Sequence, residues 1–135
     1  MSTDTRTRDL VVSRVIDAPV EQVWRAWTDP DMIRSWWGPE GFTSHKAEMD
    51  VREGGRYILN MMRASEEEGG GDFYDAGVYN VVLPNQRLEM TDYFSDAEGN
   101  PIDPTELGMP ADFPREVEMI VEIARFWASF AVYNP

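Results

Sequence analysis

The residue types that most often carry chemistry are scarce in this chain. It contains no cysteine and a single histidine, His45. Without cysteine there are no disulfides, no thiol catalysis and no thiolate metal sites, and one imidazole excludes any site that needs two. His45 lies in a predicted strand, where we interpret it as a surface or partly buried structural histidine. We therefore expect neither a metal ion nor another cofactor.

Two glycine-containing segments only superficially resemble ligand-binding loops. Residues 69–71 are three glycines, but no Gly-Lys-Ser/Thr follows to complete a phosphate-binding loop. Taking Gly99 as the sixth position of a calcium loop puts Phe94 first and Thr105 twelfth, where an aspartate and a glutamate belong. We interpret the first segment as a hairpin tip and the residues around Gly99 as a turn.

Tryptophan is the most informative residue type. Trp24 and Trp27 fall on one stripe of a predicted helix, whereas Trp36 and Trp37 are adjacent and point to different sides of theirs. Such residues either pack in a core or line an apolar cavity, since small-molecule pockets are mainly apolar and aromatic. Both interpretations stay open at this point.

The charge balance excludes several classes of partner. The chain has 25 acidic and 12 basic residues, a formal net charge of −13, which repels nucleic acid and anionic membrane surfaces. The chain has no apolar run near the ~20 residues of a membrane span and no signal-peptide pattern at its start, so we expect a cytoplasmic protein. Ten acids and one base lie between Glu89 and Glu122. They form either a solvated surface or a docking face for a basic partner.

The first quarter of the chain predicts a strand and two short helices. Residues 10–16 are β-rich, and apolar residues then recur at helical spacing from Val20 to Trp27. The sequence from Thr28 to Pro30 combines a capping residue with a proline, which predicts a second helix that ends at residues 38–39.

The rest of the chain predicts strands. Alternation or β-rich composition indicates strands over residues 42–51, 56–62, 73–83, 87–94 and 116–123, with a long loop over 95–115. This order predicts an α+β fold with an antiparallel sheet. The last twelve residues, 124–135, have no acid and four aromatic residues, and their spacing fits a helix and a strand equally well.

Several motifs, in this order, resemble one family. They are VIDAPVEQVWRAWTDP at 15–30, WWGP at 36–39 followed by Gly41 and Phe42, DVREGGRY at 50–57, GVY at 77–79 and PNQRL at 84–88. The chain is similar in these motifs to the activator of Hsp90 ATPase homologue 1-like proteins of the START / Bet v 1-like superfamily, also called SRPBCC. The resemblance runs from about residue 9 to residue 123.

The resemblance implies a helix-grip fold, in which a curved antiparallel sheet wraps a long C-terminal helix around a cavity. It divides the chain into a flexible lead over 1–8, the domain over 9–123 and an atypical aromatic tail over 124–135. Twelve residues are too few for a strand, a turn and a long helix, so we expect that helix to be short or missing. An apolar face would then be exposed, and we expect a homodimer to cover it.

The family includes carriers of hydrophobic ligands, Hsp90 co-chaperone domains and polyketide aromatase/cyclases. We expect non-enzymatic binding of a small hydrophobic molecule in a cavity between sheet and helices. The alternatives are a chaperone-partner module and a cyclase-like enzyme, whose acid or base would be Asp92, Tyr93 or His45. The expected cavity lining is Trp24, Trp27, Trp37, Tyr57, Leu59, Met61 and Tyr79.

Overall fold

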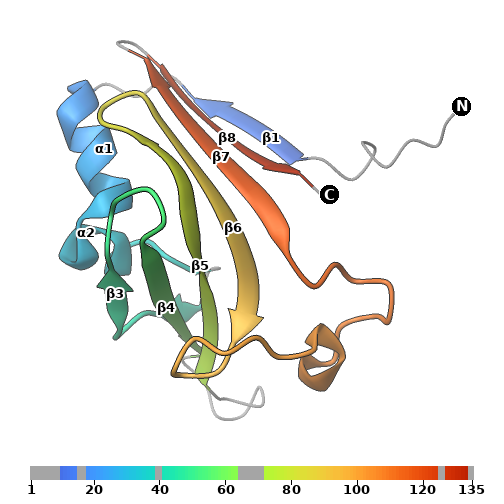
Figure 1. The fold of residues 1–135 in the computed structure, drawn as a ribbon. Helices are drawn as coiled ribbons and strands as arrows, with labels where there is room; N and C mark the ends of the chain where they lie inside the picture. Colours follow the sequence, from blue (N-terminus) through green and yellow to red (C-terminus); the bar gives the residue numbers. More distant parts are fainter. Residues whose placement is uncertain (1–9, 15–17, 39–40, 64–71, 125–126, 134–135) are drawn as a thin grey trace, which may run out of the picture.

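A curled antiparallel sheet with two short helices at one end makes up the described part of the protein (Figure 1). The structure, a computed structural model, describes residues 10–14, 18–38, 41–63, 72–124 and 127–133. The predicted lead over 1–8 and the glycines at 69–71 lie outside these residues. This architecture confirms the predicted α+β helix-grip class.

The strands follow one another around the sheet in a simple order. It runs β1-β8-β7-β6-β5-β4-β2, with β3 also paired to β4, and every pairing is antiparallel. The strands are β1 (Leu10–Arg14), β2 (Phe42–Thr43), β3 (Ala47–Met49), β4 (Arg56–Arg63), β5 (Asp72–Leu83), β6 (Arg87–Ser95), β7 (Val117–Ala124) and β8 (Trp127–Tyr133).

The two helices begin where the sequence predicts, but the second ends at Arg34 rather than at residues 38–39, so Trp36 and Trp37 follow the helix instead of lying on it. Helix α1 (Val20–Thr28) starts after Pro19, whose carbonyl accepts from two backbone N–H groups of the first turn. Helix α2 (Pro30–Arg34) is capped by Asp29, whose Oδ1 accepts from the backbone N–H groups of Asp31 (2.9 Å) and Met32 (3.1 Å). The shared residue Asp29 makes the link so short that the helices form one compact pair.

The core lies between this helical pair and one side of the sheet. Register partners of an antiparallel sheet share a face, so alternate residues of β4, β5, β6 and β7 point together toward α1 and α2. We call this the helix-facing side. Its buried members include Tyr57, Leu59, Tyr79, Leu88, Met90, Met119 and Val121, with Ile33 of α2 among them.

The strand predicted over 42–51 is wrong in one respect, because it is broken into β2 and β3. The break is held by Asn60 of β4, which is fully buried. Its side-chain oxygen accepts from the backbone N–H of His45 (3.2 Å), and its own backbone N–H donates to the carbonyl of Lys46 (3.0 Å). The buried side-chain amide of Asn60 thus accepts the hydrogen bond of His45 at the point where the two strands are interrupted.

The aromatic tail resolves as a strand. β8 pairs with β7 on one side and with β1 on the other, and its register sets Phe130 across from Val121. The tail therefore lies within the sheet as its penultimate strand rather than lying over a face of it. Within the described residues, no helix follows it.

The long segment after β6 is more ordered than the predicted loop. It contains a 3-10 helix, η3 (Pro104–Leu107), capped by Asp103, which also pairs with Arg115 (2.7 Å). The Oδ1 atom of Asp96 accepts from the backbone N–H groups of Glu98 and Asn100, 2.9 Å each, which confirms the predicted turn. Two acids of the proposed docking face thus stabilise local structure.

The exposed apolar face expected after loss of a C-terminal helix is not seen among the described residues. On β6 and β7 the helix-facing residues Leu88, Met90, Met119 and Val121 are all buried. The large apolar side chains that are exposed, among them Val11, Leu83 and Phe113, lie on separate elements. The homodimer stays a prediction without this support.

The hydrogen bonds that Asn60 makes to His45 and Lys46, between β2 and β3, lead to a prediction about stability. Replacing Asn60 with Ala leaves the His45 N–H without its acceptor and opens a small void, so the free energy of unfolding should fall by roughly 1–3 kcal/mol. Urea denaturation followed by tryptophan fluorescence measures this. The exposed Asn80→Ala variant is the control and should change it by less than about 0.5 kcal/mol. Equal losses would contradict the bridging role.

Candidate functional site

Two aspartates lie side by side on the helix-facing side of the sheet. Asp75 of β5 is 3% exposed, and Asp92 of β6 is half-buried. Asp92 is the register partner of Gly77, two residues after Asp75, so both carboxyl groups share one face and are diagonal neighbours. They hydrogen-bond to each other through a shared proton. Carboxyl groups are rarely buried together, so this pair is unusual.

A tyrosine from the next strand reaches the pair across β5. The hydroxyl of Tyr57 on β4 donates to Oδ2 of Asp92 at 2.6 Å. Tyr57, Gly77 and Asp92 are register partners in one row across three strands. A Cβ at Gly77 would lie 2.5 Å from the Tyr57 hydroxyl oxygen and 2.1 Å from the carbonyl oxygen of Thr91. Only glycine at this position lets the bond form.

Trp37 covers the pair from the helical side. Its Nε1–H donates to Oδ1 of Asp75 at 3.1 Å. Trp37 also makes edge contacts with Trp27 (6.4 Å between ring centroids) and Trp36 (5.6 Å). Trp36 in turn donates from Nε1 to the carbonyl of Ala26 in α1 at 2.9 Å. The segment after α2 thus couples the helical pair to the carboxyl groups.

Burial decides the protonation of the site. Loss of solvent raises the pKa of Asp75 well above its usual range, and the charge of Asp92 raises it further. Burial also raises the pKa of Asp92, against the hydrogen bonds from Asp75 and Tyr57, which lower it. Among the described residues, no basic side chain contributes to either pKa. The pair therefore keeps a proton at pH values above the usual titration range of a carboxyl group.

The pKa of the surrounding tyrosines is also raised. For Tyr57 the causes are burial and the charges of Asp92 and Asp75, and for Tyr79 burial is the largest cause. Both hydroxyls are therefore neutral donors at physiological pH. In the part of the chain that the structure describes, no group of three or more His, Cys, Asp or Glu side chains could hold a metal ion. The site can thus accept hydrogen bonds, bind a cation or exchange a proton.

The residues expected to line a cavity gather on the helix-facing side. Tyr57, Leu59 and Tyr79 are at most 2% exposed and form the core, and the tryptophans pack against them. Met61 is half-buried beside the bend at Gly38. The structure therefore places most of the predicted residues in or against one core, and of these Trp37 and Tyr57 contact the carboxyl pair. Their role in ligand binding stays a prediction.

The three candidate acid or base residues do not form one site. Asp92 belongs to the carboxyl pair, but Tyr93 is on the other face of β6, where its hydroxyl accepts from Arg56 (2.8 Å) and donates to the Gly99 carbonyl (3.0 Å). His45 is exposed, with Nε2 3.2 Å from Oδ1 of Asp72. Of the three, only Asp92 lies next to the predicted cavity residues.

The residue that sequence reasoning missed is Asp75. Its position in the strand alternation indicates its burial, because every second residue from Phe73 to Tyr79, which includes Asp75 and Gly77, lies on one face of the strand. Asp92 is similarly flanked by Met90 and Phe94 two residues away. A carboxylate on the apolar phase of two neighbouring strands distinguishes this pair from the other acidic residues.

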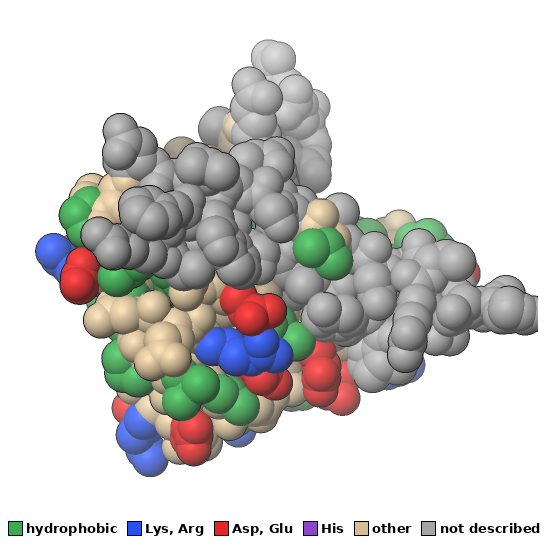
Figure 2. Space-filling model, turned by 90° about the horizontal axis from the view of Figure 1, so that it is seen from above, with side chains coloured by type: hydrophobic (Ala, Val, Ile, Leu, Met, Phe, Trp, Pro, Cys, Tyr) green, Lys and Arg blue, Asp and Glu red, His purple; other side chains and the backbone are tan. Residues whose placement is uncertain are grey.

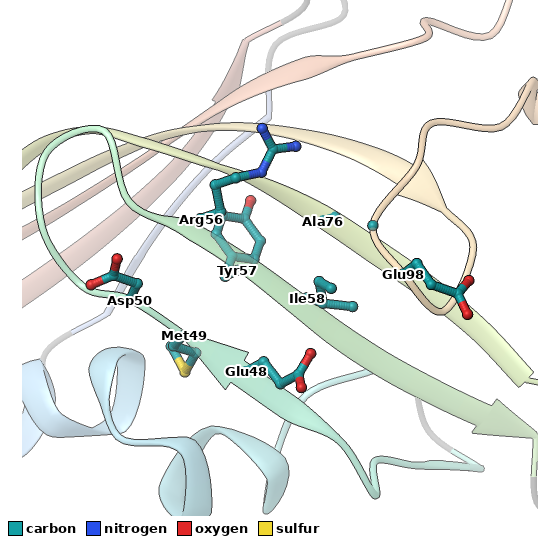
Figure 3. A pocket seen from close by; sticks show the side chains of 9 residues that line it. Glu48, Met49, Asp50, Arg56, Tyr57, Ile58, Ala76 and Glu98 are labelled. Atoms are coloured by element: carbon teal, nitrogen blue, oxygen red, sulfur yellow. The ribbon is translucent and has the colours of Figure 1, made fainter.

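Two pockets open away from the carboxyl pair. One, of about 440 Å³, lies largely on the other side of the sheet under the turn at 96–100 (Figure 3). Its floor is Ile58 and Ala76, and Glu48 and Glu98 lie on either side of Ile58. The other, of about 340 Å³, is an apolar groove on α1 and α2 that includes Trp27 and Trp36.

The charged surface is mixed. Seen from above, the described part of the molecule carries acidic side chains beside basic ones, with hydrophobic side chains between them (Figure 2). Arg87, for example, pairs with Glu89 (2.6 Å) and Glu122 (3.1 Å). None of the described helices has the length and apolar character needed to cross a membrane.

The carboxyl pair predicts a specific pH dependence of stability. Because burial raises the pKa of Asp75, above about pH 4 the folded protein binds more protons than the unfolded chain. The free energy of unfolding should therefore fall as pH rises through the folded pKa. An asparagine side chain retains the hydrogen bonds of a protonated carboxyl, so Asp75→Asn should flatten this fall in melts from pH 5 to 9. Glu118→Gln, at an exposed site, should not.

The row of Tyr57, Gly77 and Asp92 predicts non-additive mutational effects. Gly77→Ala should lower the free energy of unfolding by roughly 1–3 kcal/mol through overpacking. Tyr57→Phe should lower it by about 1–2 kcal/mol through loss of the bond to Asp92. Since both changes break the same bond, the double variant should lose less than the sum. Additive losses in chemical denaturation would show that Gly77 does not serve that bond.

Comparison with known proteins agrees with this architecture. Residues 17–124 match the family model described as Activator of Hsp90 ATPase homolog 1-like protein. A crystal structure of a Chromobacterium violaceum protein is similar, with 27% identity and a TM-score of 0.75, covering 95% of this chain and 80% of that one. A Mycobacterium smegmatis protein is similar in fold, with 21% identity and a TM-score of 0.75, covering 97% and 75%. No curated protein matches. The family match spans the helices and the strands that hold the carboxyl pair, so the chain belongs to the Activator of Hsp90 ATPase homolog 1-like family.

Proposed function

We propose that this protein binds a small hydrophobic molecule on the helix-facing side of its sheet, between the sheet and the helical pair, without transforming it. The observation that carries the proposal is the Asp75–Asp92 pair, set among aromatic and aliphatic side chains and joined to Tyr57 and Trp37. Pockets for small molecules have this composition, mainly apolar with a few polar groups that fix orientation.

The energetics of burial support a ligand role for the pair. Two carboxyl groups in an apolar interior cost folding free energy, and apolar side chains of similar volume are often as stabilising or more so. Stability alone therefore does not account for Asp75 and Asp92. Binding of a ligand that hydrogen-bonds to these carboxyl groups would explain why they are buried, whereas packing does not.

A second candidate function is acid–base catalysis. It is favoured by one observation, the raised pKa of Asp92 next to a proton-holding Asp75. Such a pair resembles in principle an acid and a base that exchange one proton. This alternative predicts turnover of a bound polyketide-like substrate that Asp92→Asn abolishes while binding remains.

The proposal extends to the protein's setting. We expect it to act in the cytoplasm and as a homodimer; light scattering that gave a monodisperse monomer would refute the dimer. A chaperone-partner role remains the alternative that uses a surface instead of a cavity. It would need a basic partner whose binding is sensitive to salt.

Ligand binding is tested by thermal stability. A ligand that binds only the folded state raises the melting temperature in proportion to its concentration above Kd. We expect such a shift from some members of a panel of fatty acids, sterols and polycyclic aromatic compounds. Trp37→Phe removes the N–H beside the site and should reduce the shift, whereas Trp36→Phe, at an exposed ring, is the matched control. If no compound raises the melting temperature, the proposal fails.

A further inference from the structure

We propose that the pocket under the turn at 96–100 binds a small zwitterion, an ω-amino carboxylate whose two charged ends are joined by an apolar chain. This pocket, of about 440 Å³, lies largely on the side of the sheet that faces away from α1 and α2, which we call the outer side (Figure 3). The inference is therefore independent of the hydrophobic ligand proposed for the helix-facing side. It follows from the charges of the pocket wall and from the apolar surface between them.

Two acidic side chains of the pocket wall are neutralised within the protein. Oε2 of Glu48 lies 3.5 Å from Nζ of Lys46, and Oδ2 of Asp50 lies 2.8 Å from Nε of Arg52. A cation that arrived at either carboxylate would compete with a basic side chain already in place. Glu48 and Asp50 therefore add little to the recognition of a ligand.

The other two charged side chains of the wall, Arg56 and Glu98, have no counter-charge among the described residues. The guanidinium of Arg56 donates to the hydroxyl of Tyr93 (2.8 Å), which is a neutral acceptor, and it forms no ion pair in the described part of the chain. The carboxylate of Glu98 likewise has no ion pair there. Both side chains are exposed. The wall thus presents one positive and one negative charge to a ligand.

Tyr93 holds the two sides of the pocket together. Its hydroxyl accepts from Arg56 on β4 and donates to the carbonyl of Gly99 (3.0 Å), in the turn that also carries Glu98. The turn is itself stabilised by Asp96, whose Oδ1 accepts from the backbone N–H of Glu98 (2.9 Å). A wall that is ordered before the ligand arrives reduces the entropy that binding costs.

The surface between the two charges is apolar. Ile58 and its register partner Ala76 form the floor, and in Figure 3 Ala76 lies between Arg56 and Glu98. A Cβ at Gly99 would lie 3.1 Å from Cδ1 of Ile58, so the turn packs directly on this floor. Glu98 lies beside Ile58, which is two residues, or roughly 6–7 Å, from Arg56 along β4. The charges of the ligand should be separated by about that distance, with methylene groups between them.

A zwitterion fits this wall better than an ion of either sign. Its carboxylate can form a charge-assisted, bidentate bond with Arg56, and its ammonium group can pair with Glu98. An anion alone would meet the repulsion of a chain whose net charge is −13, and a cation alone would leave Arg56 without a partner. Because both side chains are exposed, each contact should change affinity by only about two- to fivefold.

Four probes of one chain length test this inference. They are 6-aminohexanoate, hexanoate, hexylamine and 1-hexanol, titrated at neutral pH and physiological salt into the full chain labelled with nitrogen-15 and followed by NMR. We expect 6-aminohexanoate to bind about two- to fivefold more tightly than hexanoate or hexylamine, and 1-hexanol to bind most weakly. It should shift the backbone N–H signals of Ile58 and Gly99 and leave the indole N–H of Trp37 unchanged. In 4-aminobutanoate the charges are too close together, so it should bind more weakly.

Variants assign the two charges of the ligand to the two side chains. Arg56→Gln should reduce the affinity for 6-aminohexanoate to that for hexylamine, and Glu98→Gln should reduce it to that for hexanoate. Arg25→Gln and Glu21→Gln, at exposed positions of α1, remove the same charges elsewhere and should change neither affinity. Unchanged N–H signals outside the pocket verify that each variant is folded.

Several outcomes would overturn the inference. They are equal binding of 6-aminohexanoate and either singly charged probe, a preference for the zwitterion that survives Arg56→Gln or Glu98→Gln, and no binding of 6-aminohexanoate at all. A shift confined to the indole N–H of Trp37 would place the ligand on the helix-facing side and would also contradict it. None of these results bears on the melting-temperature test of hydrophobic ligand binding, so the two proposals fail separately.

Discussion

The hydrogen bond from the Tyr57 hydroxyl to Asp92 is the constraint on which the rest of the site depends. It spans three strands and requires a residue without a side chain at Gly77 in the middle one. It also requires the register that sets the three residues in one row. A shift of one residue would move every side chain of the shifted strand to its other face and expose the pair. Site geometry and sheet register are thus one property of this sequence.

The same alternation explains why carboxyl groups are buried at all. Positions that bring Leu59, Tyr79 and Met90 into the core also bring Asp75 and Asp92 there, because all lie on the helix-facing phase of their strands. Burial then determines their chemistry, since the low-polarity surroundings favour the protonated form. Among the described residues, no basic side chain neutralises the two carboxyl groups, and a proton between them does so instead.

How much of this can be predicted from sequence depends on the range of the interactions. The stripe from Val20 to Trp27 and the cap at Asp29 are local, so both helices are predictable within a few residues. Alternation likewise identifies Tyr57, Leu59 and Tyr79 as one face. The break between β2 and β3 is not predictable, because it depends on Asn60 from another strand. The conformation of the tail is not predictable for the same reason. Residues 127–133 fit a helix or a strand equally well, and only the free edges of β1 and β7 decide for a strand. Composition and period indicate which face a residue occupies, but not which residue lies across from it.

Trp37 links the protonation of the pair to the helices that cover it. Its N–H bond to Asp75 strengthens when that carboxyl becomes charged, because a charged acceptor forms the stronger bond. Trp37 contacts Trp36 and Trp27 by ring edges, and Trp36 is bonded to the Ala26 carbonyl of α1. A change of charge at Asp75 therefore alters a hydrogen bond to Trp37, which belongs to a contiguous aromatic cluster that joins α1 and α2.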